Sequence, residues 1–217
     1  MKTNARLKTA IALNAAIVVL EAGAIGYSMM RNGAIENFVF YTQCSNLMGA
    51  IACLACLIAE VRGLRSGDDG APSRGMRWFK YCSACCTAMT FFVVLFVLVP
   101  MMENAGMPGW RFMYVEGSKS ITHLAGPVLI FVSYVFLEAD RAMTMRQSAI
   151  GLIFTLVYAA VAYVCNYLLL WDGPYPFFQV WNMPLWQTVL WFIALLAFAF
   201  ALCQLPRLLG RRLCQAE

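Results

Sequence analysis

Residues 38–60 read FVFYTQCSNLMGAIACLACLIAE, an apolar run with no charged residue before Glu60. A helix needs about 20 predominantly apolar residues in a row to cross the hydrocarbon core of a bilayer. This run meets that length. It therefore predicts a transmembrane helix, and it decides the fold class that the rest of the chain has to fit.

Five further runs of similar length and apolarity accompany it. The chain is 62% hydrophobic and 12% charged, whereas ordinary soluble domains are about half apolar. We therefore predict an all-α polytopic membrane protein, a single integral membrane domain over residues 1–217 with short loops. The first run is too long for a signal peptide and lacks a small-residue cleavage site, so we expect it to persist as a helix. The six predicted helices span about 9–29, 38–60, 82–102, 120–138, 148–170 and 186–206.

The basic residues alternate between the two ends of these helices, with 13 of the 16 on one side. Positive charge accumulates in cytoplasmic loops, so we expect both termini in the cytoplasm. The same loops account for the net charge of +5, and no nucleic-acid partner is expected. The 13 residues are Lys2, Arg6, Lys8, Arg62, Arg65, Arg74, Arg77, Lys80, Arg141, Arg146, Arg207, Arg211 and Arg212.

The nine cysteines are odd in number and mostly lie within the predicted helices, which argues against a disulfide framework. Cys53-x-x-Cys56 and Cys82-x-x-Cys85 would suit zinc if all four thiolates met near the cytoplasmic face. Structural zinc sites normally lie on turns, and cysteine also serves as a small apolar residue in helix contacts. We therefore expect no metal and no cofactor.

A stripe of small and polar residues follows one face of the 38–60 helix at spacings of three and four. Such a stripe faces other helices rather than lipid. Packing alone explains it, because small residues allow close approach and hydroxyl and amide groups bond across helices. The stripe consists of Thr42, Ser45, Asn46, Gly49, Cys53, Cys56 and Glu60.

Depth gives the stripe a second interpretation. His123, the only histidine, lies about one turn into its helix from the outer side, as Thr42 does in its own. Ionisable groups inside membranes are commonly functional. A hydroxyl and an imidazole at one depth fit nucleophilic acyl transfer, with Thr42 as nucleophile and His123 as general base. Asn46 or Ser45 would support the site or donate to an oxyanion.

A third group that orients the imidazole is expected, but the sequence does not select one. Glu21, Asp172 and Glu103 are the candidates. The outer end of the fifth predicted helix lies at the depth of Thr42 and His123, and it supplies candidate cavity-lining residues. The segment 171–186, rich in aromatics and proline, is expected to form an interfacial belt, with a lid over the cavity as the alternative. The candidate lining residues are Tyr163, Asn166 and Tyr167.

Three segments carry a resemblance to a known family. They are FYTQCSNL at 40–47, THLAGP at 122–127 and GPYPFF at 173–178. In order and spacing they resemble the androgen-induced-gene family of membrane proteins and its bacterial relatives. The best-understood members are threonine-dependent hydrolases of fatty acid esters of hydroxy fatty acids. The resemblance implies a lipid ester substrate, Thr42 as the nucleophile and His123 as its partner, in a bacterial plasma membrane.

Other functions remain open. Cys44, close to Thr42, admits an acyltransferase with a cysteine nucleophile, although successive helix positions point about 100° apart and the two residues cannot both face His123. The same polar cavity would also suit a proton-coupled transporter or a protein that binds a lipid or small ligand without turning it over. Labelling by a fluorophosphonate probe separates an enzyme from these alternatives.

Overall fold

The computed structural model describes residues 2–171 and 175–215. Within these ranges the chain is almost entirely helical and contains no strand. Six helical stretches are long and apolar enough to cross a membrane, which confirms the predicted fold class. They run over Ala5–Asn32, Tyr41–Ser66, Arg74–Asn104, Ile121–Glu138, Met145–Tyr167 and Leu185–Arg212.

Three of these stretches are continuous α-helices, and three are assembled from shorter segments. The continuous helices are α1 (Lys2–Asn32), α3 (Tyr41–Ser66) and α10 (Leu185–Gln215). The third stretch comprises α4 (Arg74–Val93), the π-helix η1 (Val94–Leu98) and α5 (Val99–Asn104). The fourth comprises the π-helix η2 (Ile121–Ala125), α7 (Gly126–Ser133) and the π-helix η3 (Tyr134–Glu138). The fifth comprises α8 (Met145–Ser148), the 3₁₀-helix η4 (Ala149–Leu152) and α9 (Ile153–Tyr167).

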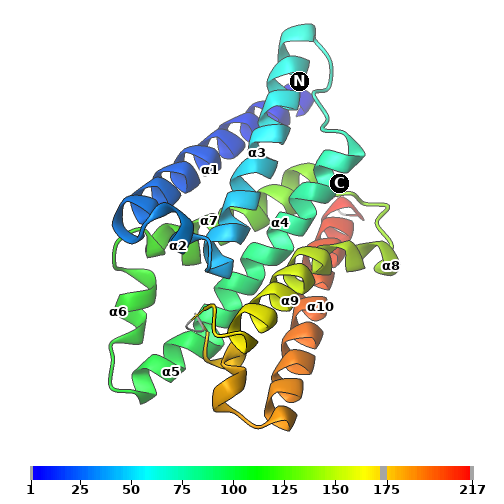
Figure 1. Cartoon of the computed structure of the whole chain (residues 1–217). Coiled ribbons are helices and arrows are strands. Elements are labelled where there is room, and N and C mark those ends of the chain that lie inside the picture. The colour runs from blue at the N-terminus through cyan, green and yellow to red at the C-terminus, as the bar shows by residue number, and fades with distance from the viewer. Residues whose placement is uncertain (1, 172–174, 216–217) are drawn as a thin grey trace.

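Helix α4 forms the centre of the bundle. It contacts α3 and α7 on one side and α10 and η4 on the other. Helices α1 and α3 lie against each other, and α9 and α10 form the opposite side (Figure 1). Short helices complete the loops at the end of the bundle where α3 begins, namely α2 (Ala34–Asn37), α6 (Gly109–Tyr114), η5 (Pro176–Phe178) and η6 (Val180–Asn182).

The polar stripe of α3 faces the other helices, as its spacing predicts. All seven of its members are buried. Gly49 lies so close to α7 that an added Cβ would fall 2.5 Å from Cδ1 of Ile130. Cys53 and Cys85 belong to one apolar cluster, and no group of three or more His, Cys, Asp or Glu side chains among the described residues is placed to hold a metal. Cys53 and Cys85 pack as small residues within this cluster.

The third membrane stretch begins at Arg74, well before the predicted start at 82. Lys80, expected in a cytoplasmic loop, is consequently inside the bundle and fully buried. Its ammonium contacts Glu138 Oε1 at 2.7 Å, Ser133 Oγ at 2.6 Å and Asn14 Oδ1 at 2.5 Å. Asn14 in turn donates to Glu60 Oε2 at 3.0 Å. Paired in this way, a lysine is tolerated where a hydropathy reading excludes it.

Both ends of the chain lie at the same end of the bundle, as an even number of crossings requires. Arg6 donates to the carbonyl of Phe136 at the end of the fourth stretch, over 2.9 Å. Arg211 near the end of α10 donates to the carbonyl of Arg141, over 3.3 Å. The buried network of Asn14, Glu60, Lys80, Ser133 and Glu138, called here the inner network, lies toward this end.

Candidate active site

Thr42 and His123 line the same cavity. It has a volume of about 730 Å³ and lies at the end of the bundle away from the chain termini, between α1, the start of α3, α6 and the segment leading into η2. Thr42 lies in the first turn of α3, and His123 lies within η2. The two side chains are 7% and 8% exposed. The structure thus places on one cavity two residues for which the sequence indicates only equal depth.

His123 is held in a defined orientation by a backbone group. Its Nδ1 lies 2.7 Å from the carbonyl oxygen of Met113 in α6. Because a carbonyl only accepts hydrogen bonds, Nδ1 carries the proton and Nε2 carries the lone pair. Among the described residues none bonds Nε2. The ring also packs edge-on against Tyr114, with centroids 6.4 Å apart. This is the tautomer that a general base requires.

The carboxylates expected to orient the imidazole do not contact it among the described residues. Glu103 accepts from the backbone N–H of Trp110 at 3.2 Å. Glu21 is fully buried, and neither of its oxygens has a partner in the described part of the chain. Asp172 lies outside the described residues. The Met113 carbonyl takes the expected role, and no residue type in the sequence signals it because any residue can supply a backbone carbonyl.

Asn46 connects the helices of the two candidates. Its amide nitrogen donates to the carbonyls of Thr42 and Thr122, each at 2.8 Å. Both amide hydrogens are therefore taken, and in this arrangement Asn46 braces the site and has no hydrogen left for an oxyanion. Ser45 is also occupied, with its hydroxyl 3.0 Å from the Thr42 carbonyl and 3.0 Å from Thr90 Oγ1.

Cys44 takes no part in the cavity wall described above. Its thiol is half-buried and donates to the carbonyl of Phe38 at 3.2 Å. Thr42, two positions earlier, faces the cavity. This agrees with the helical geometry, which lets only one of the two residues face His123.

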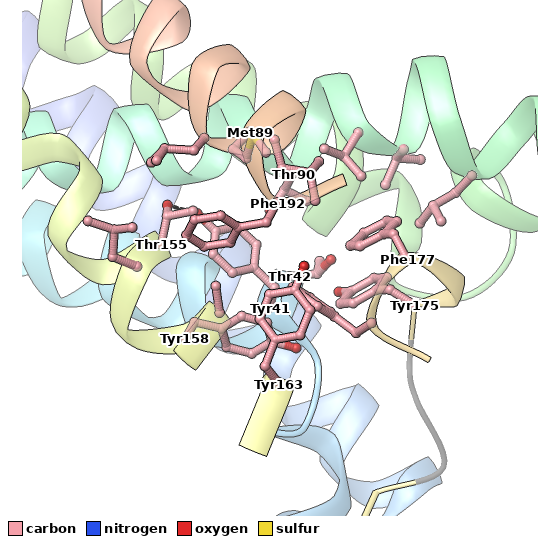
Figure 2. Close-up of a pocket in the computed structure, with 18 residues that line it drawn as sticks. Tyr41, Thr42, Met89, Thr90, Thr155, Tyr158, Tyr163, Tyr175, Phe177 and Phe192 are labelled. Atoms are coloured by element: carbon pink, nitrogen blue, oxygen red, sulfur yellow. Dashed lines mark hydrogen bonds between the residues drawn. The ribbon is translucent and has the colours of Figure 1, made fainter. Parts of the chain in front are cut away.

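A second, apolar cavity of about 60 Å³ adjoins the first. Thr42, Leu98 and Tyr175 line both cavities, so that Thr42 lies at the junction. Figure 2 shows the aliphatic and aromatic side chains around it, which come from α3, α4, α9, α10 and η5. The larger cavity, which polar and charged residues line in part, and the smaller apolar cavity thus meet at Thr42.

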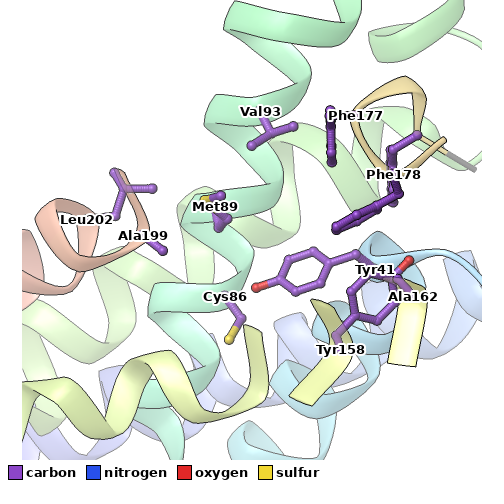
Figure 3. Packing of buried hydrophobic residues seen from close by; sticks show 11 residues of the cluster. Tyr41, Cys86, Met89, Val93, Tyr158, Ala162, Phe177, Phe178, Ala199 and Leu202 are labelled. Atoms are coloured by element: carbon purple, nitrogen blue, oxygen red, sulfur yellow. The ribbon is translucent and has the colours of Figure 1, made fainter. Parts of the chain in front are cut away.

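The apolar cavity rests on a core cluster that includes aromatic residues from distant parts of the chain (Figure 3). Tyr41 and Tyr158 meet edge to face, with ring centroids 5.1 Å apart. Phe177 and Phe178 are each 5% exposed. The described part of the 171–186 segment therefore covers the cavity at this point, as the lid alternative requires, while Trp181 and Trp186 remain on the surface.

Of the three expected lining residues on α9, Tyr163 lines the apolar cavity. Asn166 instead donates to the carbonyl of Ala162 in its own helix, over 2.7 Å. Tyr167 is 77% exposed because α9 ends there. Asn166 and Tyr167 were therefore wrongly expected at the wall.

Tyr175 is a site residue that the sequence analysis did not select. It is 7% exposed and lies at the boundary of both cavities. Burial raises the pKa of its phenol above the ordinary value, and hydrogen-bonding contact with Thr42 acts in the opposite direction. The signal available in the sequence was the dense aromatic segment, which gave no indication that this ring would face Thr42.

Comparison of the chain with protein-family models, curated proteins and solved structures finds no match. The fold and the site define the class, a membrane protein with six helical stretches in its described residues and with a hydroxyl and an imidazole on one cavity.

Proposed function

We propose that this protein is an intramembrane hydrolase of lipid esters, with Thr42 as the nucleophile and His123 as the general base. The observation that carries the proposal is the position of Thr42, at the junction of an apolar cavity with the polar cavity that His123 also lines. A lipid ester has the matching division, an acyl chain beside a polar carbonyl. Fatty acid esters of hydroxy fatty acids are the substrates that the sequence resemblance favours.

The chemistry follows from the two side chains. Nε2 of His123 accepts the proton of the Thr42 hydroxyl as Oγ1 bonds to the ester carbonyl carbon. The resulting tetrahedral intermediate expels the alcohol, which takes the proton from Nε2. Water then gives its proton to Nε2 while its oxygen attacks the threonyl ester. The fatty acid leaves as the proton returns to Thr42, and no metal or cofactor is required for this sequence of steps.

The test is covalent labelling of the purified protein in detergent with a fluorophosphonate probe. Wild type should be labelled at Thr42, and Thr42→Ala and His123→Ala should lose labelling while they retain the wild-type melting temperature. Thr155→Val is a matched control, because Thr155 lines the apolar cavity but its hydroxyl is bonded to Tyr41 at 2.8 Å. Undiminished labelling or ester turnover in Thr42→Ala would exclude the mechanism.

The site is proposed to face the outer leaflet of a bacterial plasma membrane, with both termini in the cytoplasm. The positive residues support this orientation, since they gather at the end of the bundle that holds the termini. Cysteines introduced singly at Ser66 and at Glu116 in a chain lacking exposed thiols would report it. A membrane-impermeant maleimide should label only the Glu116→Cys protein in intact cells.

A proton-coupled transporter is the second candidate, and one observation favours it. Asn14, Glu21 and Ser28 recur every seven residues on α1, and all three are buried. Asn14 belongs to the inner network, and Ser28 lines the cavity of Thr42 and His123. Glu21 lies between them, and its carboxyl oxygens have no partner among the described residues. Proton flux through proteoliposomes that disappears in Glu21→Gln, together with no probe labelling of folded wild type, would select this function.

A further inference from the structure

Tyr175 places a phenol beside the proposed nucleophile. The residue precedes η5, and its ring stacks on Phe177 with centroids 5.3 Å apart and an interplanar angle of 2°. Phe178 packs against the same ring from its edge at 6.2 Å. Two aromatic neighbours therefore fix the direction of the phenol, and a hydroxyl carried by a fixed ring is pre-organised for one partner.

That partner is Thr42. Thr42, at the start of α3, and Tyr175 line both cavities, and the contact of the phenol with the Thr42 side chain lowers its pKa, against the effect of burial. Figure 2 shows Thr42 and Tyr175 next to each other at the cavity. The phenol O–H is the single side-chain donor of Tyr175, and Tyr175 lies beside the start of α3, where the proposed nucleophile is.

The other tyrosines that line the apolar cavity are already hydrogen-bonded or do not line the larger cavity. The Tyr158 hydroxyl donates to the carbonyl of Val39 at 2.7 Å. The Tyr41 hydroxyl lies 2.8 Å from Thr155 Oγ1. The Tyr163 hydroxyl is buried without a partner among the described residues, but it is not a wall of the polar cavity. Tyr175 is thus the phenol whose hydroxyl faces Thr42.

An oxyanion forms when Thr42 attacks a carbonyl, and it needs a hydrogen-bond donor. Asn46 and Ser45 were the sequence candidates, but the amide hydrogens of Asn46 both bond carbonyls and the Ser45 hydroxyl is bonded as well. A neutral phenol in a buried site remains a donor at neutral pH, since burial raises its pKa.

We propose that Tyr175 is a catalytic residue that donates its O–H to the carbonyl oxygen as this oxygen gains negative charge. The proposal rests on the hydrolase function above. No bond of the tyrosine forms or breaks, and its proton stays on the phenol oxygen throughout. Loss of one such donor lowers kcat by about 10²–10³.

Turnover of p-nitrophenyl octanoate by the purified full chain tests this role. Tyr175→Phe keeps the ring stack, so we expect kcat to fall by about 100-fold with KM within about twofold of wild type. Tyr167→Phe is the matched control, an exposed phenol at the end of α9 that lines neither cavity, and should retain wild-type kcat. A Tyr175→Phe protein with wild-type kcat, or one with raised KM and unchanged kcat, overturns the proposal.

A second substitution separates catalysis from folding. 3-Fluorotyrosine at position 175 keeps the ring and the contacts with α3 but makes the hydroxyl a stronger donor. We expect kcat to rise while the melting temperature stays at the wild-type value, and an unchanged kcat contradicts the proposed donor. If wild type turns over esters no faster than Thr42→Ala, the hydrolase function itself is refuted. If wild type is active and the Tyr175 variants have the wild-type kcat, only the role of Tyr175 is refuted.

Discussion

Asn46 is the residue on which the geometry of the candidate site depends most directly. It is fully buried, and its two bonds join the carbonyl of Thr42 in α3 to that of Thr122 in η2, the residue before His123. A truncated side chain leaves both carbonyls without these partners. A displacement of about 1 Å between reacting groups is enough to cost about 10²-fold in rate.

Asn46→Ala is therefore expected to reduce the rate of probe labelling at Thr42 by about 10²-fold and the free energy of unfolding by about 1–3 kcal/mol. Labelling kinetics and thermal melting in detergent measure the two effects. Asn166→Ala is the control, because Asn166 is equally buried but bonds only within α9. Labelling at the wild-type rate in Asn46→Ala would show that the brace is not needed.

Some residues of the candidate site can be predicted from the sequence, and others cannot. Thr42 and His123 were predicted because their chemistry is rare inside a membrane and their depth can be counted along a helix. The Met113 carbonyl and the Tyr175 phenol were not, since the first has no side-chain signature and the second depends on how a loop packs. Depth along a helix axis also says nothing of direction around it, which is why Asn166 and Tyr167 were wrongly placed at the wall.

At the scale of elements, the π-helix η2 positions His123. Pro127 has no N–H to give to the carbonyl of His123 four residues earlier, and the Gly126 N–H instead bonds the carbonyl of Ile121. Wide turns of this kind are frequent at functional sites. Gly126 packs directly against the carboxylate of Glu21, with no room for a Cβ between them.

Gly126→Ala is expected to lower stability by about 1–3 kcal/mol, because the added methyl overlaps Glu21. The additional loss should disappear when the same change is made in a Glu21→Ala background, where the overlap is absent. Gly23→Ala on α1 serves as the control, since an added Cβ there meets nothing within 4 Å. Equal losses from Gly126→Ala in both backgrounds, measured by thermal melting, would contradict this account.

Asp140, in the loop after η3, makes the stability of the bundle depend on pH at the end that holds the chain termini. Burial opposes its ionisation, but hydrogen bonds from Trp78 Nε1 at 2.6 Å and Arg74 Nε at 3.0 Å outweigh burial and lower its pKa. A lowered folded-state pKa stabilises the fold above the unfolded value, about 3.9 for Asp, and this contribution is lost as pH falls through the folded-state pKa.

Asp140→Asn should therefore lower the melting temperature at pH 7, with a loss of about 1–2 kcal/mol. The difference from wild type should shrink as pH falls below about 4. Melting curves of both proteins across this range measure it. Glu116→Gln, at an exposed ion pair with Arg111, is the control and should differ little from wild type at either pH. A difference that stays constant with pH would exclude the charge of Asp140 as the cause.

The start of the third membrane stretch shows the limit of hydropathy for placing elements. Arg74, Arg77 and Lys80 made residues 74–80 look like loop, whereas α4 already begins at Arg74, after the N-cap Ser73. Hydropathy scores each residue alone. Lys80 is stable in the bundle through partners on two other membrane stretches, and pairing across helices cannot be read from one segment.

At the scale of the whole molecule, the bundle holds two polar regions at opposite ends, with apolar packing and the buried carboxyl group of Glu21 between them. One is the cavity of Thr42 and His123, which lies at the end away from the chain termini and has a volume of about 730 Å³. The inner network is closed, since Lys80 and Glu138 are ion-paired at 2.7 Å with side chains 0% and 1% exposed. We infer that the cavity of Thr42 and His123 is the site of the proposed hydrolysis. The inner network fixes the relative positions of α1, α3, α4 and the fourth stretch.

Lys80→Met tests this division of roles. It leaves the carboxylates of Glu138 and Glu60 buried without the ammonium, and breaking a buried pair costs about 3–5 kcal/mol. Lys80→Met/Glu138→Gln should recover much of that loss, because a buried pair replaced on both sides is often close to neutral. Lys119→Met, which removes a partly exposed cation at the cavity of Thr42 and His123, should change stability little. The folded fraction of Lys80→Met should still label at Thr42 at the wild-type rate, and a labelling loss larger than the loss of folded protein would mean that the two ends of the bundle are coupled.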